Sequence, residues 1–129
     1  MCFILMPFSP SRATRIYRII GEIARDSGLI AKRADQIYGD NPIMEDIWGS
    51  LNESGFVIAE CTGRNPNVFY ELGIAHTLGK KVIIVTQREK DIPFDIRSFR
   101  YIKYEDNADG YRKLRDGLTQ HIAAIQRGE

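Results

Sequence analysis

Short apolar runs alternate with amphipathic stretches along this chain of 129 residues. The apolar runs are rich in Ile, Val and Phe and end at Pro or polar residues, which predicts buried β-strands. These predicted strands comprise residues 2–6, 29–31, 56–59, 81–86 and 101–104. The last run alternates apolar and polar residues, so we expect it at an edge of the sheet.

Between the strands, apolar residues recur every three or four positions, as on the buried face of an amphipathic helix. These stripes predict four main helices and lie within residues 16–23, 44–51, 66–78 and 111–125. Gly28 is suited to end the first helix, and Asn41 is suited to cap the second before Pro42. Residues 87–99 are expected to form a loop, with one helical turn after residues 92–94.

Strands that alternate with helices through short connections favour a parallel sheet with right-handed crossovers. We therefore predict a three-layer α/β/α, flavodoxin-like fold with a five-stranded parallel sheet in the order 2-1-3-4-5. The sequence contains no internal repeat and no linker, and we expect residues 1–129 to form a single domain.

The composition argues against several classes of protein. A formal net charge of +1 gives no electrostatic reason to expect nucleic acid as a partner. Two cysteines cannot form a disulfide framework and fit a reducing compartment. The apolar start at residues 2–6 is too short for a signal peptide, and no run is long enough to span a membrane. We expect a cytoplasmic protein with no membrane partner.

The segment after the third predicted strand carries the strongest functional signal. Gly63 permits a sharp turn, Asn65 is suited to cap a helix, and Pro66 is suited to its first position. Asn67 and Glu71 are four residues apart, so both side chains lie on one face near the start of this helix. The alternative for Glu71 is a solvated carboxylate that the helix dipole favours.

The predicted strand order places a ligand crevice between the first and third strands, where the winding direction of the sheet reverses. Two loops meet there, residues 7–9 after the first strand and residues 60–65 after the third. The face that carries Asn67 and Glu71 belongs to the second of these loops. Fold and helix geometry thus predict the same site.

Several familiar sites are missing from the sequence. It contains neither G-x-G-x-x-G nor G-x-x-x-x-G-K-[ST], and no acidic cluster follows the first strand. His76 and His121 lie on different predicted helices, and no metal-ligand spacing occurs, so we expect no metal and no cofactor. Cys61 is either a nucleophile beside the site or a small buried hydrophobe.

A single carboxylate with amide and hydroxyl neighbours is sufficient for one kind of chemistry. It can attack or stabilise the C1′ atom of a sugar while a glycosidic bond breaks, because the transition state resembles an oxocarbenium ion. A base that leaves readily reduces the need for a strong general acid. The same groups are not sufficient for phosphoryl transfer or peptide hydrolysis.

Three stretches, residues 6–9, 33–35 and 63–76, resemble the nucleoside 2-deoxyribosyltransferase-like family. The similarity is greatest to its bacterial nucleotide-binding branch, which is related to TIR-like domains, and it extends from residue 2 to about residue 104. The resemblance implies a flavodoxin-like fold, a homodimer, and Glu71 as the nucleophile. The TIR relatives similarly use a Glu on a helix to cleave the nicotinamide glycosidic bond of NAD.

The chain departs from this family in two respects. The transferases carry a second acid shortly before the nucleophile, where this chain has Asn65; Glu60 either replaces that acid or is a solvated loop carboxylate. The transferases also complete their sites with terminal residues of a neighbouring subunit, and residues 126–129 show no equivalent. The resemblance therefore supports a nucleoside-type ligand better than transfer between bases.

The remaining candidates have structural alternatives. Phe8 either stacks on a base or packs in the core, and Ser9 either meets a phosphate or caps a helix. Arg33 and Asp35 meet a phosphate and a ribose hydroxyl, or form a surface ion pair, which we favour slightly. Arg64 either meets a phosphate or is solvated. The predicted ligand-binding residues are Pro7, Phe8, Ser9, Arg33, Asp35, Glu60, Gly63, Arg64, Asn65, Asn67 and Tyr70.

Three functions are consistent with these residues. The first is cleavage or transfer of the N-glycosidic bond of a nucleoside, nucleotide or NAD-like molecule. The second is a nucleotide-binding sensor in which Glu71 only binds ribose hydroxyls. The third is a TIR-like module for signalling and self-assembly.

Overall fold

The computed structural model describes residues 2–6, 11–33, 49, 55–92 and 101–128. Within them, five parallel strands form one sheet in the order β2-β1-β3-β4-β5, so the predicted order is confirmed. The strands are β1 (Cys2–Leu5), β2 (Ala31–Arg33), β3 (Phe56–Glu60), β4 (Lys81–Thr86) and β5 (Tyr101–Lys103). The short β5 lies at an edge, as its alternating pattern predicted.

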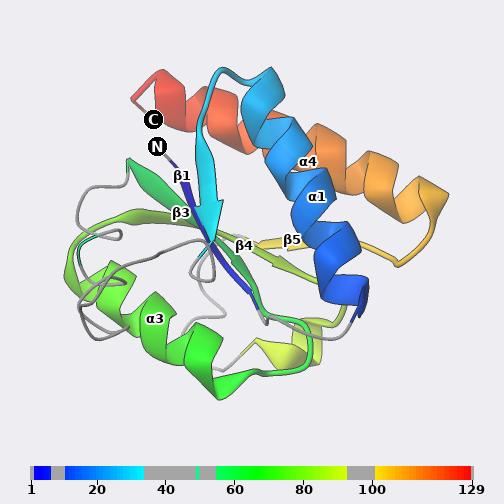
Figure 1. The fold of residues 1–129 in the computed structure, drawn as a ribbon, viewed down its shortest axis with the longest axis horizontal. Helices are drawn as coiled ribbons and strands as arrows, with labels where there is room; N and C mark the ends of the chain where they lie inside the picture. Colours follow the sequence, from blue (N-terminus) through cyan, green and yellow to red (C-terminus); the bar gives the residue numbers. More distant parts are fainter. Residues whose placement is uncertain (1, 7–10, 34–48, 50–54, 93–100, 129) are drawn as a thin grey trace.

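Helices cover both faces of the sheet in a three-layer arrangement (Figure 1). The helices are α1 (Ser11–Asp26), α3 (Pro66–Thr77) and α4 (Ala108–Gln126), with a short 3-10 helix, η2 (Glu89–Asp91). Figure 1 shows α1 and α4 side by side on one face and α3 on the other. No helix among the described segments is long and apolar enough to cross a membrane.

Strand alternation divides the core into two halves. On the α1/α4 side, Ile4 and Ile58 pack with apolar residues of both helices. On the α3 side, Leu5 and Ala59 pack against the buried stripe of α3. Because β1 and β3 are buried on both faces, they carry the continuous apolar runs seen in the sequence.

One predicted strand begins later in the structure than in the prediction. β2 begins at Ala31 rather than at residue 29, because Leu29 still belongs to the end of α1. Its N–H donates a hydrogen bond to the Ala24 carbonyl at 2.9 Å. Ile30 is 74% exposed, so its apolar side chain misled the strand prediction. The loop after β4 contains η2, a short helix that was not predicted, and the helical turn predicted after residue 94 lies outside the described residues.

The predicted second helix, with its start at Pro42, lies outside the described residues except for Gly49, which is helical. The same is true of the predicted loop at residues 7–9. The carboxyl ends of β3 and β4, in contrast, are described completely up to residue 92. They form part of the sheet edge at which the ligand crevice is predicted.

Candidate active site

The loop between β3 and α3 has a fixed backbone. The Thr62 N–H donates to Glu60 Oε1 at 2.6 Å, and the Gly63 N–H donates to Asp91 Oδ2 at 2.9 Å. The Arg64 N–H donates to the Cys61 carbonyl at 3.2 Å. Each of these amides is therefore satisfied within the protein.

Two consecutive residues of this loop are left-handed. Gly63 has φ +85°, which confirms the sharp turn predicted for it, and Arg64 has φ +57°. For a residue with a Cβ atom this conformation costs about 1–2 kcal/mol. The hydrogen bonds on either side of Arg64 hold it there, and its exposed side chain extends from a backbone of defined shape.

The start of α3 is capped as predicted. Asn65 Oδ1 accepts from the Asn67 N–H at 2.9 Å and from the Val68 N–H at 3.3 Å. Pro66, at the first helical position, has no N–H, and the Phe69 N–H donates to the Asn65 carbonyl at 3.3 Å. The first turn of α3 therefore keeps no free backbone donor for a bound phosphate.

Glu71 lies on the next turn of α3, on the helix face that also carries the exposed Asn67. Its side chain is half-buried, and this burial raises the pKa of its carboxyl from 4.5 to about 7. Among the residues that the structure describes, the carboxylate has no hydrogen-bond or ion-pair partner. Glu71 is thus neither fully solvated nor sealed in the core, and near neutral pH it exists in both protonation states.

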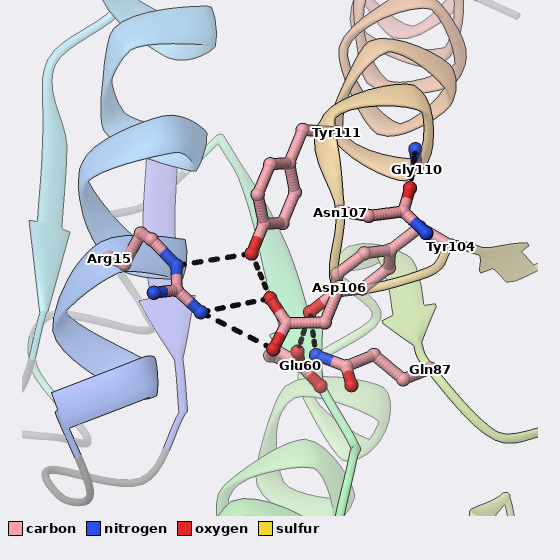
Figure 2. Close-up of polar contacts among 8 residues, drawn as sticks. All are labelled: Arg15, Glu60, Gln87, Tyr104, Asp106, Asn107, Gly110 and Tyr111. Atoms are coloured by element: carbon pink, nitrogen blue, oxygen red, sulfur yellow. Dashed lines mark hydrogen bonds and ion pairs between the residues drawn. The ribbon is translucent and has the colours of Figure 1, made fainter.

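Glu60 has the opposite surroundings. It is only 4% exposed, and strand alternation directs it to the α1/α4 side, whereas Glu71 belongs to the helix on the other side. Oε1 accepts from Thr62, and Oε2 accepts from the Tyr104 hydroxyl, whose contact with Gln87 is drawn in Figure 2. The solvated-carboxylate interpretation of Glu60 is therefore wrong, and burial with both oxygens engaged also argues against the direct ligand contact predicted for it.

Arg33 ends β2 and is only 8% exposed, so its predicted position at the surface is wrong, while its predicted ion pair with Asp35 lies outside the described residues. Its guanidinium carbon lies 4.4 Å from the ring centroid of Tyr17, in a cation–π contact with α1. Asp35, its predicted neighbour in the site, lies outside the described residues. So do Pro7, Phe8 and Ser9.

Tyr70, one of the predicted ligand-binding residues, is 62% exposed on α3. Cys61, in contrast, is buried, and burial together with the charges of Glu60 and Asp91 raises the pKa of its thiol to about 12. A thiol with this pKa is protonated at neutral pH, which favours the small-hydrophobe interpretation over the nucleophile. The described segments contain no cluster of side chains that could hold a metal ion.

Sequence reasoning missed the groups that fix the loop. Asp91 and Gln87 lie in a stretch predicted only as a loop, and Tyr104 is predicted only as the end of an edge strand. One signal was available: Glu60, Gln87 and Tyr104 are polar-tipped residues at the ends of three neighbouring strands. Parallel strands bring such positions to one edge of the sheet.

Only the comparison with solved structures identifies proteins similar to this chain. No protein-family model matches the chain, and no curated protein matches it significantly. Among solved structures, it has the fold shared by 2-deoxyribosyltransferases, a CMP N-glycosidase and TIR domains. The fold implied by the sequence resemblance is thereby confirmed.

Three solved structures illustrate the likeness. The CMP N-glycosidase BcmB of Clostridium botulinum has a TM-score of 0.70 at 15% identity, covering 92% of this chain and 98% of its own. The 2-deoxyribosyltransferase of Bacillus psychrosaccharolyticus has a TM-score of 0.68 at 13% identity, covering 89% of this chain and 90% of its own. The TIR domains of the activated Roq1 resistosome have a TM-score of 0.55 at 14% identity, covering 92% of this chain and 81% of their own. Identities this low establish the shared fold alone.

Proposed function

We propose that this protein cleaves the N-glycosidic bond of a nucleoside, nucleotide or NAD-like molecule, with Glu71 as the nucleophile. The observation that carries the proposal is the state of Glu71 itself: half-buried, without a polar partner among the described residues, and with a pKa of about 7. A carboxylate with no protein donors keeps its lone pairs available to a ligand. Strongly perturbed carboxyls in a crevice are candidates for function.

The fold supports this assignment. α3 begins at the carboxyl edge of the sheet, where open α/β sheets bind ligands. Two of the solved structures with this fold are a CMP N-glycosidase and a 2-deoxyribosyltransferase. Both names describe chemistry at the bond between a sugar and a base.

In the proposed reaction, a Glu71 oxygen donates an electron pair to the sugar C1′ atom as the C1′–N bond breaks. A purine or pyrimidine base leaves with the bonding pair and takes up a proton from solvent, whereas nicotinamide leaves NAD as a neutral molecule; in either case a glycosyl ester forms on Glu71. Attack by water on C1′ then releases the free sugar and regenerates the carboxylate. Attack by a second base would instead complete a transfer.

The described residues suggest how the ligand is held. Asn65 uses its side-chain oxygen for the cap, which leaves its NH₂ group for a ligand, and Asn67 presents a whole carboxamide one turn before Glu71. Tyr70 offers an exposed ring for stacking. Because the first turn of α3 has no free N–H, we assign a substrate phosphate to side chains such as Arg64 rather than to the helix terminus.

The test is chromatography of products after incubation with CMP, deoxynucleoside monophosphates, deoxynucleosides and NAD. We expect base release by the wild type and a loss on the order of 10³-fold or more in Glu71→Gln, since removal of a nucleophile elsewhere costs up to about 10⁶-fold. Glu22→Gln is a matched control: Glu22 lies on α1, where its Oε2 is 3.6 Å from Arg115. This control should retain full activity.

The alternatives give different results in the same assays. If Glu71→Gln releases base as fast as the wild type, the nucleophile assignment is wrong. A sensor would show ligand-dependent melting shifts without turnover. The TIR likeness makes assembly the other candidate, and it predicts oligomers without any small molecule.

We also propose a cytoplasmic homodimer, which light scattering and fractionation would test.

A further inference from the structure

A closed ring of hydrogen bonds joins the carboxyl ends of three strands. Glu60 is the last residue of β3, while Gln87 and Tyr104 directly follow β4 and β5. Glu60 accepts from the Thr62 N–H and from the Tyr104 hydroxyl. Gln87 closes the ring, because its Nε2 lies 3.4 Å from the Tyr104 hydroxyl and its N–H donates to Thr62 Oγ1 at 2.9 Å. Figure 2 shows its three side chains converging from separate strands.

Three members of this ring are buried, and Gln87 is partly exposed. Tyr104 is 1% exposed, Glu60 4% and Thr62 7%. Burial, followed by the charge of Glu60 and the hydrogen bond to it, raises the pKa of the Tyr104 hydroxyl, which therefore stays protonated as a donor. A buried carboxylate that loses a hydrogen-bond donor is left partly unsatisfied, so breaking either of these bonds costs stability.

The ring acts on the loop that leads to Glu71. Thr62 is bound through both its N–H and its hydroxyl, and the next N–H, that of Gly63, is bound by the buried carboxylate of Asp91. Asp91 adjoins Ile92, which packs in the core on the α3 side. The loop is therefore held by two carboxylates at consecutive residues, from opposite faces of the sheet.

This anchoring reaches Glu71 because little flexible chain intervenes. After Gly63 come Arg64, in its constrained left-handed conformation, and the capping residue Asn65. α3 then carries Glu71 as a rigid body. A displacement of the loop is therefore transmitted directly to the carboxylate.

We propose that Glu60 and Tyr104 are positioning residues, which hold the β3–α3 loop so that Glu71 keeps its place at the crevice. Neither touches the substrate. The inference rests on the proposed function of Glu71 and adds to it the device that sets the geometry of the nucleophile. A misplacement of about 1 Å can cost a reaction about 10²-fold, so the ring has a measurable consequence.

The test is Tyr104→Phe, which removes one hydroxyl and keeps the ring packed in the core. We expect kcat to fall about tenfold or more while KM stays within about twofold, because orientation rather than binding is lost. Amide exchange at Thr62 and Gly63 should accelerate about tenfold through local opening of the loop. Glu60→Gln, whose amide oxygen can still accept from Thr62, should retain more activity than Glu60→Ala.

The matched control is Tyr111→Phe. The Tyr111 hydroxyl also donates to a carboxylate, that of Asp106, but this pair ties the start of α4 to Arg15 of α1 and does not touch the loop (Figure 2). We expect Tyr111→Phe to leave kcat and the exchange of Thr62 and Gly63 unchanged. An equal loss in both variants would indicate general destabilisation and would overturn the proposal.

The two proposals can fail separately. If the wild type and Tyr104→Phe turn over substrate equally, or if exchange at Thr62 and Gly63 does not change, the positioning role is wrong, and the assignment of Glu71 as nucleophile depends only on its own test. If the wild type releases no base from any substrate, the proposed function fails. In that case exchange and the Glu71 pKa, measured by carboxyl ¹³C NMR in both variants, decide whether the ring sets the surroundings of Glu71.

Discussion

The end of β3 and the second turn of α3 each carry a glutamate, but the two carboxylates differ in burial and in hydrogen-bond donors. Glu60 is 4% exposed and has a donor on each oxygen. Glu71 is only half-buried, yet no described residue donates to it. Glu60, buried and hydrogen-bonded, therefore has a structural role. The partial burial of Glu71, to which no described residue donates, raises the pKa of its carboxyl to about 7.

The difference extends to the backbone around each group. Between Cys61 and Phe69, the protein uses the N–H groups of most residues for itself, on Glu60, Asp91 and Asn65 among others. None of these donors is directed to Glu71. The chain thus satisfies most backbone donors of the loop, whereas no described residue donates to the carboxylate on α3, as expected of a group that acts on a ligand.

Replacing each glutamate by alanine gives the largest expected contrast. Glu60→Ala leaves the Thr62 N–H and the Tyr104 hydroxyl buried without an acceptor, which should lower the free energy of unfolding by about 3 kcal/mol. Glu71→Ala removes a carboxylate that pairs with no described residue, and it should change the free energy of unfolding by less than about 1 kcal/mol at pH 7. Urea unfolding at matched m-values measures both. Equal losses would mean that the two sites do not differ as the hydrogen bonds indicate.

The pH dependence of base release provides the second test. The nucleophile must be ionised, so kcat/KM should rise with pH and level off above about 7, the pKa of the Glu71 carboxyl. Below that value the rate should fall about tenfold for each pH unit. Initial rates between pH 5 and 8.5 measure this profile. A rate that instead falls as pH rises through 7 would show that the protonated carboxyl is the active form and that Glu71 acts as an acid.

Local patterns were sufficient to predict most of the fold. The bounds of β4, the cap at Asn65 and the turn at Gly63 each depend on neighbouring residues, and all are as predicted. β2 was displaced because residues 29 and 30 are apolar but serve the end of α1 and the connection to the sheet. Apolar content alone does not distinguish a helix end from a strand.

The surroundings of the site could not be predicted in the same way. Glu60 and Tyr104 are 44 residues apart in sequence, and Gly63 and Asp91 are 28 apart. Strand register brings them together, since Glu60 pairs with Val85 of β4 and Thr86 pairs with Lys103 of β5. The sequence placed Glu71 on a helix face near the crevice, but its desolvation depends on what packs around it.

Arg64 allows a smaller test of how firmly the two carboxylates hold the loop between β3 and α3. It is kept at φ +57°, so Arg64→Gly should relieve strain and raise the free energy of unfolding by about 0.5–1 kcal/mol relative to Arg64→Ala, which keeps the strain. Both variants remove the guanidinium, so a shared rise in KM for CMP but not for cytidine would assign the phosphate to this side chain. If the glycine variant is no more stable than the alanine variant, the loop relaxes out of the left-handed conformation, and its anchoring by Glu60 and Asp91 is weaker than their hydrogen bonds imply.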